Sequence, residues 1–262
     1  MRVLVPGGAG FLGSNFVRRL AAAGDQAVVL DRLTDFGNLA RLEGVPHEFV
    51  QGDVADAVTA TGAADGCQAI VNFAAESNLD ASGLAAGGFI VTDVYGTHVL
   101  LEFARVAGIR YVQVSIVDAD RPATAPAASK AGADLQVQAY SQAYGVNASI
   151  VRGPPAYGPF QHPGAEPAAS IVRGLDEDTS PPGALEGTWI HADDHSAAVE
   201  HVLQEGEPAE IYRLGADHLR TPVEQGLAET VEWYRSRRDW WEPIKTRTET
   251  PSTEEQYARR RP

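Results

Sequence analysis

The sequence is poor in sulfur and in positive charge. Its 262 residues include one cysteine, Cys67, and one methionine, and 35 aspartates and glutamates outnumber 21 lysines and arginines. A single cysteine excludes an internal disulfide and a cysteine-rich metal site, and it suits a reducing cytoplasm. The formal net charge of −14 argues against nucleic acid or an anionic membrane as a partner. The basic end, Arg259–Arg261, is too short to reverse this balance.

Long apolar runs are also missing. No stretch approaches the roughly 20 apolar residues that a membrane-spanning helix needs. The first residues enter a predicted strand directly, which leaves no room for a signal peptide. We therefore expect a cytoplasmic protein without a membrane segment. A chain of 262 residues can bury a full core, either as one large domain or as a domain with a small appendage.

The amino-terminal 31 residues carry the strongest motif of the chain. Residues 2–6 are an apolar run typical of a buried strand, and the pattern G-x-x-G-x-x-G follows from Gly7 to Gly13. A helical pattern comes next, and a second strand over residues 27–30 ends at Asp31. Glycines let the chain turn tightly against a pyrophosphate, and Asp31 is placed to bind an adenosine ribose. This predicts a dinucleotide site; a structural glycine turn in another doubly wound fold is the alternative.

Strands and helices alternate through the rest of the chain. Further strands are predicted over residues 47–51, 68–73, 111–115, 148–151 and 210–214, and helices over residues 93–107, 127–144, 193–203 and 222–236. This alternation predicts an α/β fold, a Rossmann doubly wound parallel sheet with helices on both faces. We place a dinucleotide-binding core in residues 1–152 and a polar tail in residues 246–262. Residues 153–245 form a small, reduced substrate-binding region and a C-terminal helix of the same compact domain.

Residues after the predicted strands are candidate ligand contacts. Asp53, after the third strand, could bind an adenine amino group or cap a helix, and the sequence leaves both interpretations open. Ala74 and Ala75, after the fourth strand, would let the backbone pass close under a nicotinamide ribose. Proline and glycine become frequent after residue 152, where Pro154, Pro155 and Tyr157 lie in a rigid loop and are candidate substrate contacts.

A pair of histidines four residues apart, His191 and His195, could in principle ligate a metal. A structural turn from a strand into a helix is the alternative interpretation of this stretch, and we favour it. We therefore expect no metal site.

Several motifs follow one another in a distinctive order: GGAGFLGSNFV, VVLDRLT, GDV, VNFAAESNLDAS, SKAGADL, YGPFQHP and TWIHADDH. In this order they resemble the extended short-chain dehydrogenase/reductases, and within them the nucleotide-sugar 4,6-dehydratases. The resemblance implies NAD or NADP as cofactor, since Asp31 favours NAD whereas Arg32 could pair with the 2′-phosphate of NADP. The cofactor contacts that it implies are Gly7, Gly10, Phe11, Leu12, Gly13, Asp31, Arg32, Asp53, Val54, Phe73, Ala74, Ala75 and Lys130.

The departures from this family fall on its catalytic groups. The family's tyrosine precedes the active lysine by four positions, and four positions before Lys130 the sequence has Pro126, which has no side-chain proton to give. The family's serine or threonine after the fifth strand falls on Ile116, next to Ser115. Asp118 remains from an acid pair. Ser115 and Lys130 are therefore the candidate catalytic residues, with Asp118 as a further candidate acid.

Residues that hold a nucleotide sugar in the family are replaced as well. Its sugar-facing asparagines fall on Pro155 and Ala156, and the arginine that grips the diphosphate falls on Gly187. Two family segments also look deleted. The sequence thus combines a complete cofactor motif with an incomplete nucleotide-sugar site.

Hydride addition to a carbonyl leaves negative charge on oxygen, and a general acid typically contributes ~10²–10⁴ in rate there. Ser115 could stabilise that oxygen, or it could simply end a buried strand. A ketone flanked by a phenolic hydroxyl could instead supply its own proton, with the high effective concentration of an intramolecular group. This pattern is similar to the atypical ketoreductases of aromatic polyketide biosynthesis.

Three functions remain open at this stage. The leading hypothesis is an NAD(P)H-dependent ketoreductase that acts on an aromatic ketone of the angucyclinone type in antibiotic biosynthesis, as a monomer or homodimer. The alternatives are a nucleotide-sugar epimerase or dehydratase with substitute catalytic residues, and a non-catalytic NAD(P)-binding module.

Overall fold

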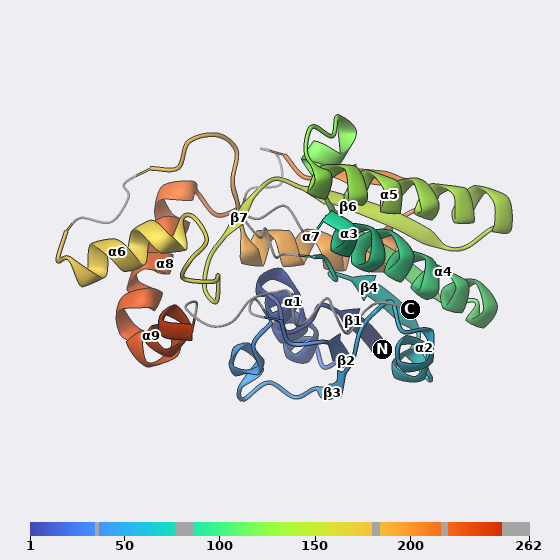
Figure 1. The fold of residues 1–262 in the computed structure, drawn as a ribbon, viewed down its shortest axis with the longest axis horizontal. Coiled ribbons are helices and arrows are strands. Elements are labelled where there is room, and N and C mark those ends of the chain that lie inside the picture. Colours follow the sequence, from blue (N-terminus) through green and yellow to red (C-terminus); the bar gives the residue numbers. More distant parts are fainter. Residues whose placement is uncertain (35–36, 77–85, 180–183, 216–219, 248–262) are drawn as a thin grey trace.

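A computed structural model of the chain describes residues 1–34, 37–76, 86–179, 184–215 and 220–247. Figure 1 shows a central sheet with helices packed on both sides, and a further group of helices at one end of the molecule. The polar tail predicted over residues 246–262 lies almost entirely outside the described residues.

The strands of the central sheet are β1 (Arg2–Pro6), β2 (Gln26–Asp31), β3 (Glu48–Gln51), β4 (Ala69–Asn72), β5 (Arg110–Ile116), β6 (Ala148–Gly153) and β9 (Ile211–Arg213). They are all parallel and lie in the order β3-β2-β1-β4-β5-β6-β9. The predicted doubly wound parallel sheet is confirmed. Between β1 and β4 the strand order reverses direction, and in such sheets ligands bind at the carboxyl ends of the strands near this point.

The α-helices are α1 (Phe11–Ala22), α2 (Ala57–Ala64), α3 (Ala86–Phe89), α4 (Gly96–Ala107), α5 (Ala125–Tyr144), α6 (Ala168–Asp176), α7 (Ala192–Glu205), α8 (Val223–Ser236) and α9 (Arg238–Arg247). Three shorter or irregular helices are η1 (Leu39–Leu42), the π-helix η2 (Ile90–Tyr95) and η3 (Val117–Asp120). Among the described residues, no helix combines the length and apolar character needed to cross a membrane.

The helix predicted over residues 93–107 begins earlier and differently in the structure. Its first turn belongs to the π-helix η2, which continues into α4. Asp93 is buried there, where its carboxylate accepts hydrogen bonds from the Glu76 backbone N–H at 3.0 Å and from Ser129 Oγ at 2.6 Å. These partners are distant in the sequence, so the local pattern could not reveal them.

Alternate residues of each strand pack against helices on opposite faces of the sheet. Leu4 and Val28 belong to a cluster with apolar residues of α2, α4 and α5, whereas Val3 and Val5 pack with residues of α1 and α7. Each fully buried aliphatic side chain contributes about 1.5–3 kcal/mol relative to an exposed one. This two-sided burial explains why the strands read as continuous apolar runs.

A third apolar cluster lies beyond the sheet, where Figure 1 shows α6, α8 and α9 grouped together. The chain reaches it through a small parallel sheet of β7 (Ala156–Tyr157) and β8 (Ile190–His191). Trp241 is fully buried in this cluster, and its indole N–H donates to the Tyr234 carbonyl at 2.8 Å. The predicted terminal helix over residues 222–236 is present as α8, but α9 follows it and was not foreseen.

His195 on α7 should make the stability of the fold depend on pH. Burial lowers the pKa of its imidazole to about 4, whereas the ordinary value is 6.5. Between these values the unfolded chain binds a proton that the folded chain does not, so the free energy of unfolding should fall as pH decreases from 6.5 toward 4. The slope from this group approaches about 1.4 kcal/mol per pH unit.

Urea unfolding of wild type and His195→Gln at several pH values measures this contribution. The variant should lose part of the slope. His201→Gln, at an exposed position of the same helix, is the matched control and should retain it. An identical slope in wild type and His195→Gln would assign the pH dependence to other groups.

Candidate functional site

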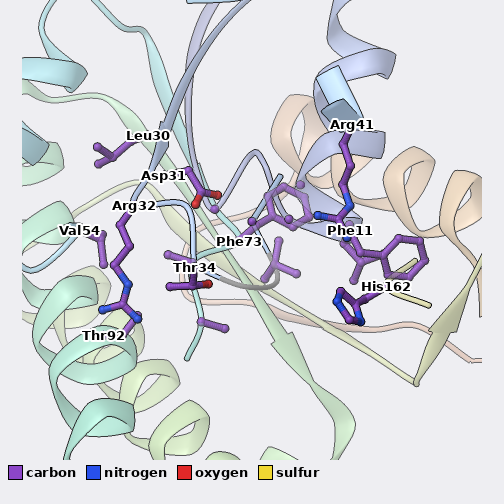
Figure 2. A pocket seen from close by; sticks show the side chains of 18 of the residues that line it. Phe11, Leu30, Asp31, Arg32, Thr34, Arg41, Val54, Phe73, Thr92 and His162 are labelled. Carbon is purple, nitrogen blue, oxygen red and sulfur yellow. The ribbon is translucent and has the colours of Figure 1, made fainter. Parts of the chain in front are cut away.

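A cavity of about 390 Å³ lies at the carboxyl ends of the strands. Figure 2 shows side chains from β2, η1 and several loops directed into it. The structure brings together there every cofactor contact expected from the sequence, together with Ser115: the lining includes Gly7, Gly10, Phe11, Leu12, Gly13, Asp31, Arg32, Asp53, Val54, Phe73, Ala74, Ala75, Ser115 and Lys130. The cavity thus coincides with the predicted dinucleotide site.

The glycine turn between β1 and α1 is closed by backbone contacts that leave no room for side chains. Gly7 has a φ of +75°, and a Cβ atom there would lie 2.7 Å from the Ala74 backbone nitrogen. A Cβ atom on Gly13 would lie 2.2 Å from the Gly7 carbonyl oxygen. Because the turn is this tight, the first N–H groups of α1 border the cavity, where they suit an anionic group such as a pyrophosphate.

Asp31, at the end of β2, is held in place by two backbone N–H groups. Its carboxylate accepts hydrogen bonds from Ala9 at 3.0 Å and from Leu33 at 2.9 Å. Burial raises the pKa of this carboxyl, and the two hydrogen bonds act against that rise. The position fits an acceptor for the hydroxyls of a ribose at the strand end.

Arg32 is turned toward carboxylates. Its guanidinium donates to Glu76 Oε2 at 2.9 Å and to Asp53 Oδ2 at 3.3 Å, and Figure 2 shows its side chain extending along the wall of the cavity toward Thr92. Asp53 also accepts from the Ala55 backbone N–H at 3.0 Å, so its carboxylate organises its own loop as well as facing the cavity.

Lys130 and Ser115 line the part of the cavity beside the ends of β4 and β5. The Lys130 ammonium donates to the Ala74 carbonyl at 3.1 Å, and the side chain is more than nine-tenths buried. The Ser115 hydroxyl donates to Asp134 Oδ2 at 2.9 Å. Lys130 therefore lies beside the residues that follow β4, whereas the Ser115 proton is engaged by an acid that the sequence analysis did not single out.

Comparison with known proteins places these features in a family. Residues 3–215 match the NAD dependent epimerase/dehydratase family. The chain belongs to this family. It is 31% identical to the dTDP-glucose 4,6-dehydratase of Streptomyces niveus over 323 aligned residues, which cover 94% of this chain and 96% of that protein. It is 38% identical to the low-salt glycan biosynthesis protein Agl12 of Haloferax volcanii over 255 residues, covering 88% and 81%.

Solved structures agree with this assignment. The dTDP-glucose 4,6-dehydratase of Bacillus anthracis, determined in complex with NAD, superimposes with a TM-score of 0.82 at 27% identity and covers 93% of this chain and 99% of its own. DesIV, a dTDP-glucose 4,6-dehydratase of Streptomyces venezuelae determined with NAD bound, gives a TM-score of 0.81 at 34% identity, with 93% and 100% covered.

The beginning of α5 holds Pro126, the residue four positions before Lys130. Thr124 caps the helix by accepting from the Ala127 N–H at 3.3 Å, and Pro126 follows in the first turn. A proline is well tolerated there because the first helical N–H groups have no partner within the helix. Asp118, the further candidate acid, is exposed on η3 and does not line the cavity.

One wall of the cavity was not foreseen. It includes Gln161 and His162, which are both buried, and Arg41, whose Nε donates to the Phe160 carbonyl at 2.8 Å. Burial lowers the pKa of Arg41 to about 10. The Tyr234 hydroxyl of α8 donates to the Gln161 carbonyl. This hydrogen bond connects the wall to the third apolar cluster, to which Tyr234 belongs. No short motif signals these contacts, because each joins residues far apart in the sequence.

The expected substrate contacts Pro154, Pro155 and Tyr157 are not among the residues lining the cavity. Tyr157 is fully buried in β7, and its hydroxyl donates to the Val223 carbonyl at 3.4 Å. Burial raises the pKa of this phenol to about 12. Its placement corrects the expectation of a ligand-facing tyrosine, since its ring fills the third apolar cluster instead.

The histidine pair of the strand-to-helix turn is built into the protein interior. His191 Nδ1 accepts from the Asp193 backbone N–H at 3.3 Å, as a cap of α7, and His195 packs near Phe73. Within the described residues, no three or more histidine, cysteine or acidic side chains come together as metal ligands would.

The close approach at Gly13 gives a direct test of the site. Gly13→Ala should lower the free energy of unfolding by about 1–3 kcal/mol, because the added methyl group overpacks the turn. It should also abolish NADH binding measured by fluorescence titration. Gly62→Ala is the matched control: a Cβ atom at Gly62, in α2, would meet nothing within 4 Å. NADH affinity equal to wild type in Gly13→Ala would place the dinucleotide elsewhere.

Proposed function

We propose that this protein is an NAD(P)H-dependent ketoreductase that reduces a ring ketone of a fused-ring aromatic polyketide of the angucyclinone type, without a tyrosine acid. The observation that carries the proposal is a contrast between the cavity and the start of α5. The groups suited to a dinucleotide are assembled in the cavity, whereas Pro126 occupies the helix position where the family resemblance leads one to expect the proton donor.

The residues present fit a nicotinamide dinucleotide. The turn at Gly7 and Gly13 forms a cradle that a Cβ atom would fill, the beginning of α1 borders it, and Asp31 offers an acceptor at the end of β2. Lys130, beside Ala74, is placed to bind the nicotinamide ribose. The bound cofactor would supply the hydride.

Few of the described side chains beside the ends of β4 and β5 are placed to give a proton to a substrate. Among the described residues that line the cavity there is no tyrosine, and Ile116 follows Ser115 at the end of β5. Ser115 donates to Asp134, and Lys130 donates to a carbonyl. When hydride adds to the carbonyl carbon, the oxygen needs a proton, and we infer that the substrate supplies it because neither Pro126 nor the engaged hydroxyl of Ser115 can. A phenolic hydroxyl flanking the ketone can give it, and the resulting phenolate regains a proton from water.

The size of the substrate region favours a large flat substrate over a sugar nucleotide. The alignment with the Streptomyces niveus enzyme spans 323 residues, more than the 262 residues of this chain, so the relative carries segments that this chain lacks. Val114, Ile116 and Ala165 give the cavity apolar surface. Burial of aromatic rings against such surface would drive binding.

Turnover of an angucyclinone ketone with NADH or NADPH tests the proposal. The expected result is equimolar loss of ketone and reduced cofactor, followed by absorbance at 340 nm and by chromatography of the alcohol. A cofactor-binding protein that oxidises neither NADH nor NADPH with any such ketone would contradict the proposal and would favour a non-catalytic NAD(P)-binding module.

A second candidate is a nucleotide-sugar dehydratase or epimerase with substitute catalytic residues. The names of the relatives favour it, since three of the four relatives named above are dTDP-glucose 4,6-dehydratases. It requires tight binding of a thymidine or uridine diphosphate sugar. Isothermal titration calorimetry with dTDP-glucose and UDP-glucose distinguishes the two candidates, because the ketoreductase should give no binding heat with either compound.

The preference between NADH and NADPH should depend on the partners of Arg32. Glu76 and Asp53 engage its guanidinium, so a 2′-phosphate must compete with them. Glu76→Gln should weaken that competition and raise the ratio of kcat/KM for NADPH to that for NADH several-fold. Glu48→Gln, at an exposed carboxylate paired with Arg2, is the control and should leave the ratio unchanged. A ratio unaltered by Glu76→Gln would exclude Arg32 as the group that senses the phosphate.

A further inference from the structure

A chain of charged and polar side chains runs from the cavity through the protein interior. It begins at Ser115, whose hydroxyl donates to Asp134 Oδ2 at 2.9 Å, and the same oxygen accepts from Arg152 Nε at 2.8 Å. Arg152 also pairs with Asp120, whose Oδ2 accepts from Arg213 Nε at 3.0 Å near the surface. Asp134 is fully buried, so its position is fixed by these partners.

The pairing with Arg152 determines what Asp134 can do for Ser115. Burial raises the pKa of the Asp134 carboxyl, and the adjacent guanidinium of Arg152 and the charge of Lys130 act against that rise. Arg152 Nε donates to the same Asp134 oxygen at 2.8 Å, and a guanidinium at this distance favours the carboxylate, which has only acceptor atoms. Within this pair the hydrogen bond must run from the Ser115 hydroxyl to Asp134.

A serine hydroxyl has one proton and two lone pairs. Once the proton is committed to Asp134, Ser115 offers only lone pairs to the cavity. A lone pair cannot stabilise negative charge that develops on a carbonyl oxygen. The sequence left open whether Ser115 is a substitute donor or only ends a buried strand, and this geometry argues against the donor role.

We propose that Asp134 is a positioning residue that withholds the Ser115 proton from the reacting oxygen and so restricts the enzyme to ketones that carry a hydroxyl beside the carbonyl. This inference rests on the proposed ketoreductase function and specifies its substrates further. Asp134 is a buried acid one helical turn after Lys130, and it does not line the cavity. It makes the substrate hydroxyl indispensable because it holds the Ser115 proton.

The test compares two substrates that differ in one group: an angucyclinone ketone with a free phenol beside the carbonyl, and its O-methyl ether. Wild type should reduce the free phenol at least ~10²-fold more efficiently than the ether, the typical contribution of a general acid. Ser115→Ala should keep the preference for the free phenol over the ether at ~10²-fold or more, because Ser115 gives no proton to either reaction.

Asp134→Asn replaces the carboxylate by a neutral acceptor of the same shape, which holds the Ser115 hydroxyl less strongly. The hydroxyl can then turn toward the cavity, and kcat/KM for the ether should rise about tenfold while the value for the free phenol changes little. The double variant Ser115→Ala/Asp134→Asn should lose this gain. A purely structural role for Asp134 would move both substrates together and would not depend on Ser115.

Ser141→Ala serves as the control. Ser141 is another buried serine on the same helix, α5, but its hydroxyl donates to the Val146 carbonyl at 2.8 Å. Its substitution should leave the ratio of the two substrates unchanged.

A loss of 10²-fold or more on the free phenol in Ser115→Ala would identify Ser115 as the donor and overturn the inference. An unchanged ratio in a folded Asp134→Asn would also overturn it. If Asp134→Asn does not fold, Ser115→Ala still decides the question. Failure of wild type to reduce either ketone would instead contradict the ketoreductase function itself, and the inference with it.

Discussion

The close packing of backbone at Gly7 and Gly13 is the constraint on which the cofactor half of the protein depends. With no Cβ atom at either position, the turn after β1 lies against the residues that follow β4, and α1 begins directly over the carboxyl ends of the strands. A single added carbon would have to displace backbone, which is far less adjustable than a side chain. The ends of β1, β2 and β4 can therefore line one cavity only because this turn stays narrow.

Arg41 connects the glycine turn to the second half of the chain. Its guanidinium donates to the carbonyls of Ala9, in the glycine turn, and of Phe160, and its charge is almost fully buried. A buried cation is costly unless its donors are satisfied, so the two carbonyls and the guanidinium fix one another. Phe160 in turn packs on Trp233 and Trp240. The third apolar cluster thus determines where Gln161 and His162 stand in the cavity.

Sequence patterns predict a site residue when its neighbours in the sequence position it. They fail when the residues that position it lie far along the chain. Asp31, Asp53 and the glycines are placed by the strand or turn that they belong to, and local patterns were enough to find them. Arg41 and Gln161 are placed by contacts across more than 70 residues, to Phe160 and Tyr234, and no motif carries that information. Tyr157 was assigned to a rigid loop because of its proline and glycine neighbours. Its burial follows from α8, which covers it, and α8 lies far along the chain.

The start of α5 can carry a proline without loss of the fold or of the cofactor cavity. Lys130 is held by its hydrogen bond to the Ala74 carbonyl and by the burial of its helix face, and neither depends on the side chain at position 126. A proline in the first turn fits helix geometry, and the Thr124 cap satisfies one of the free N–H groups. Pro126 therefore costs the helix little. Under the proposed ketoreductase function, the ligand must then bring to the cavity the proton that Pro126 cannot give.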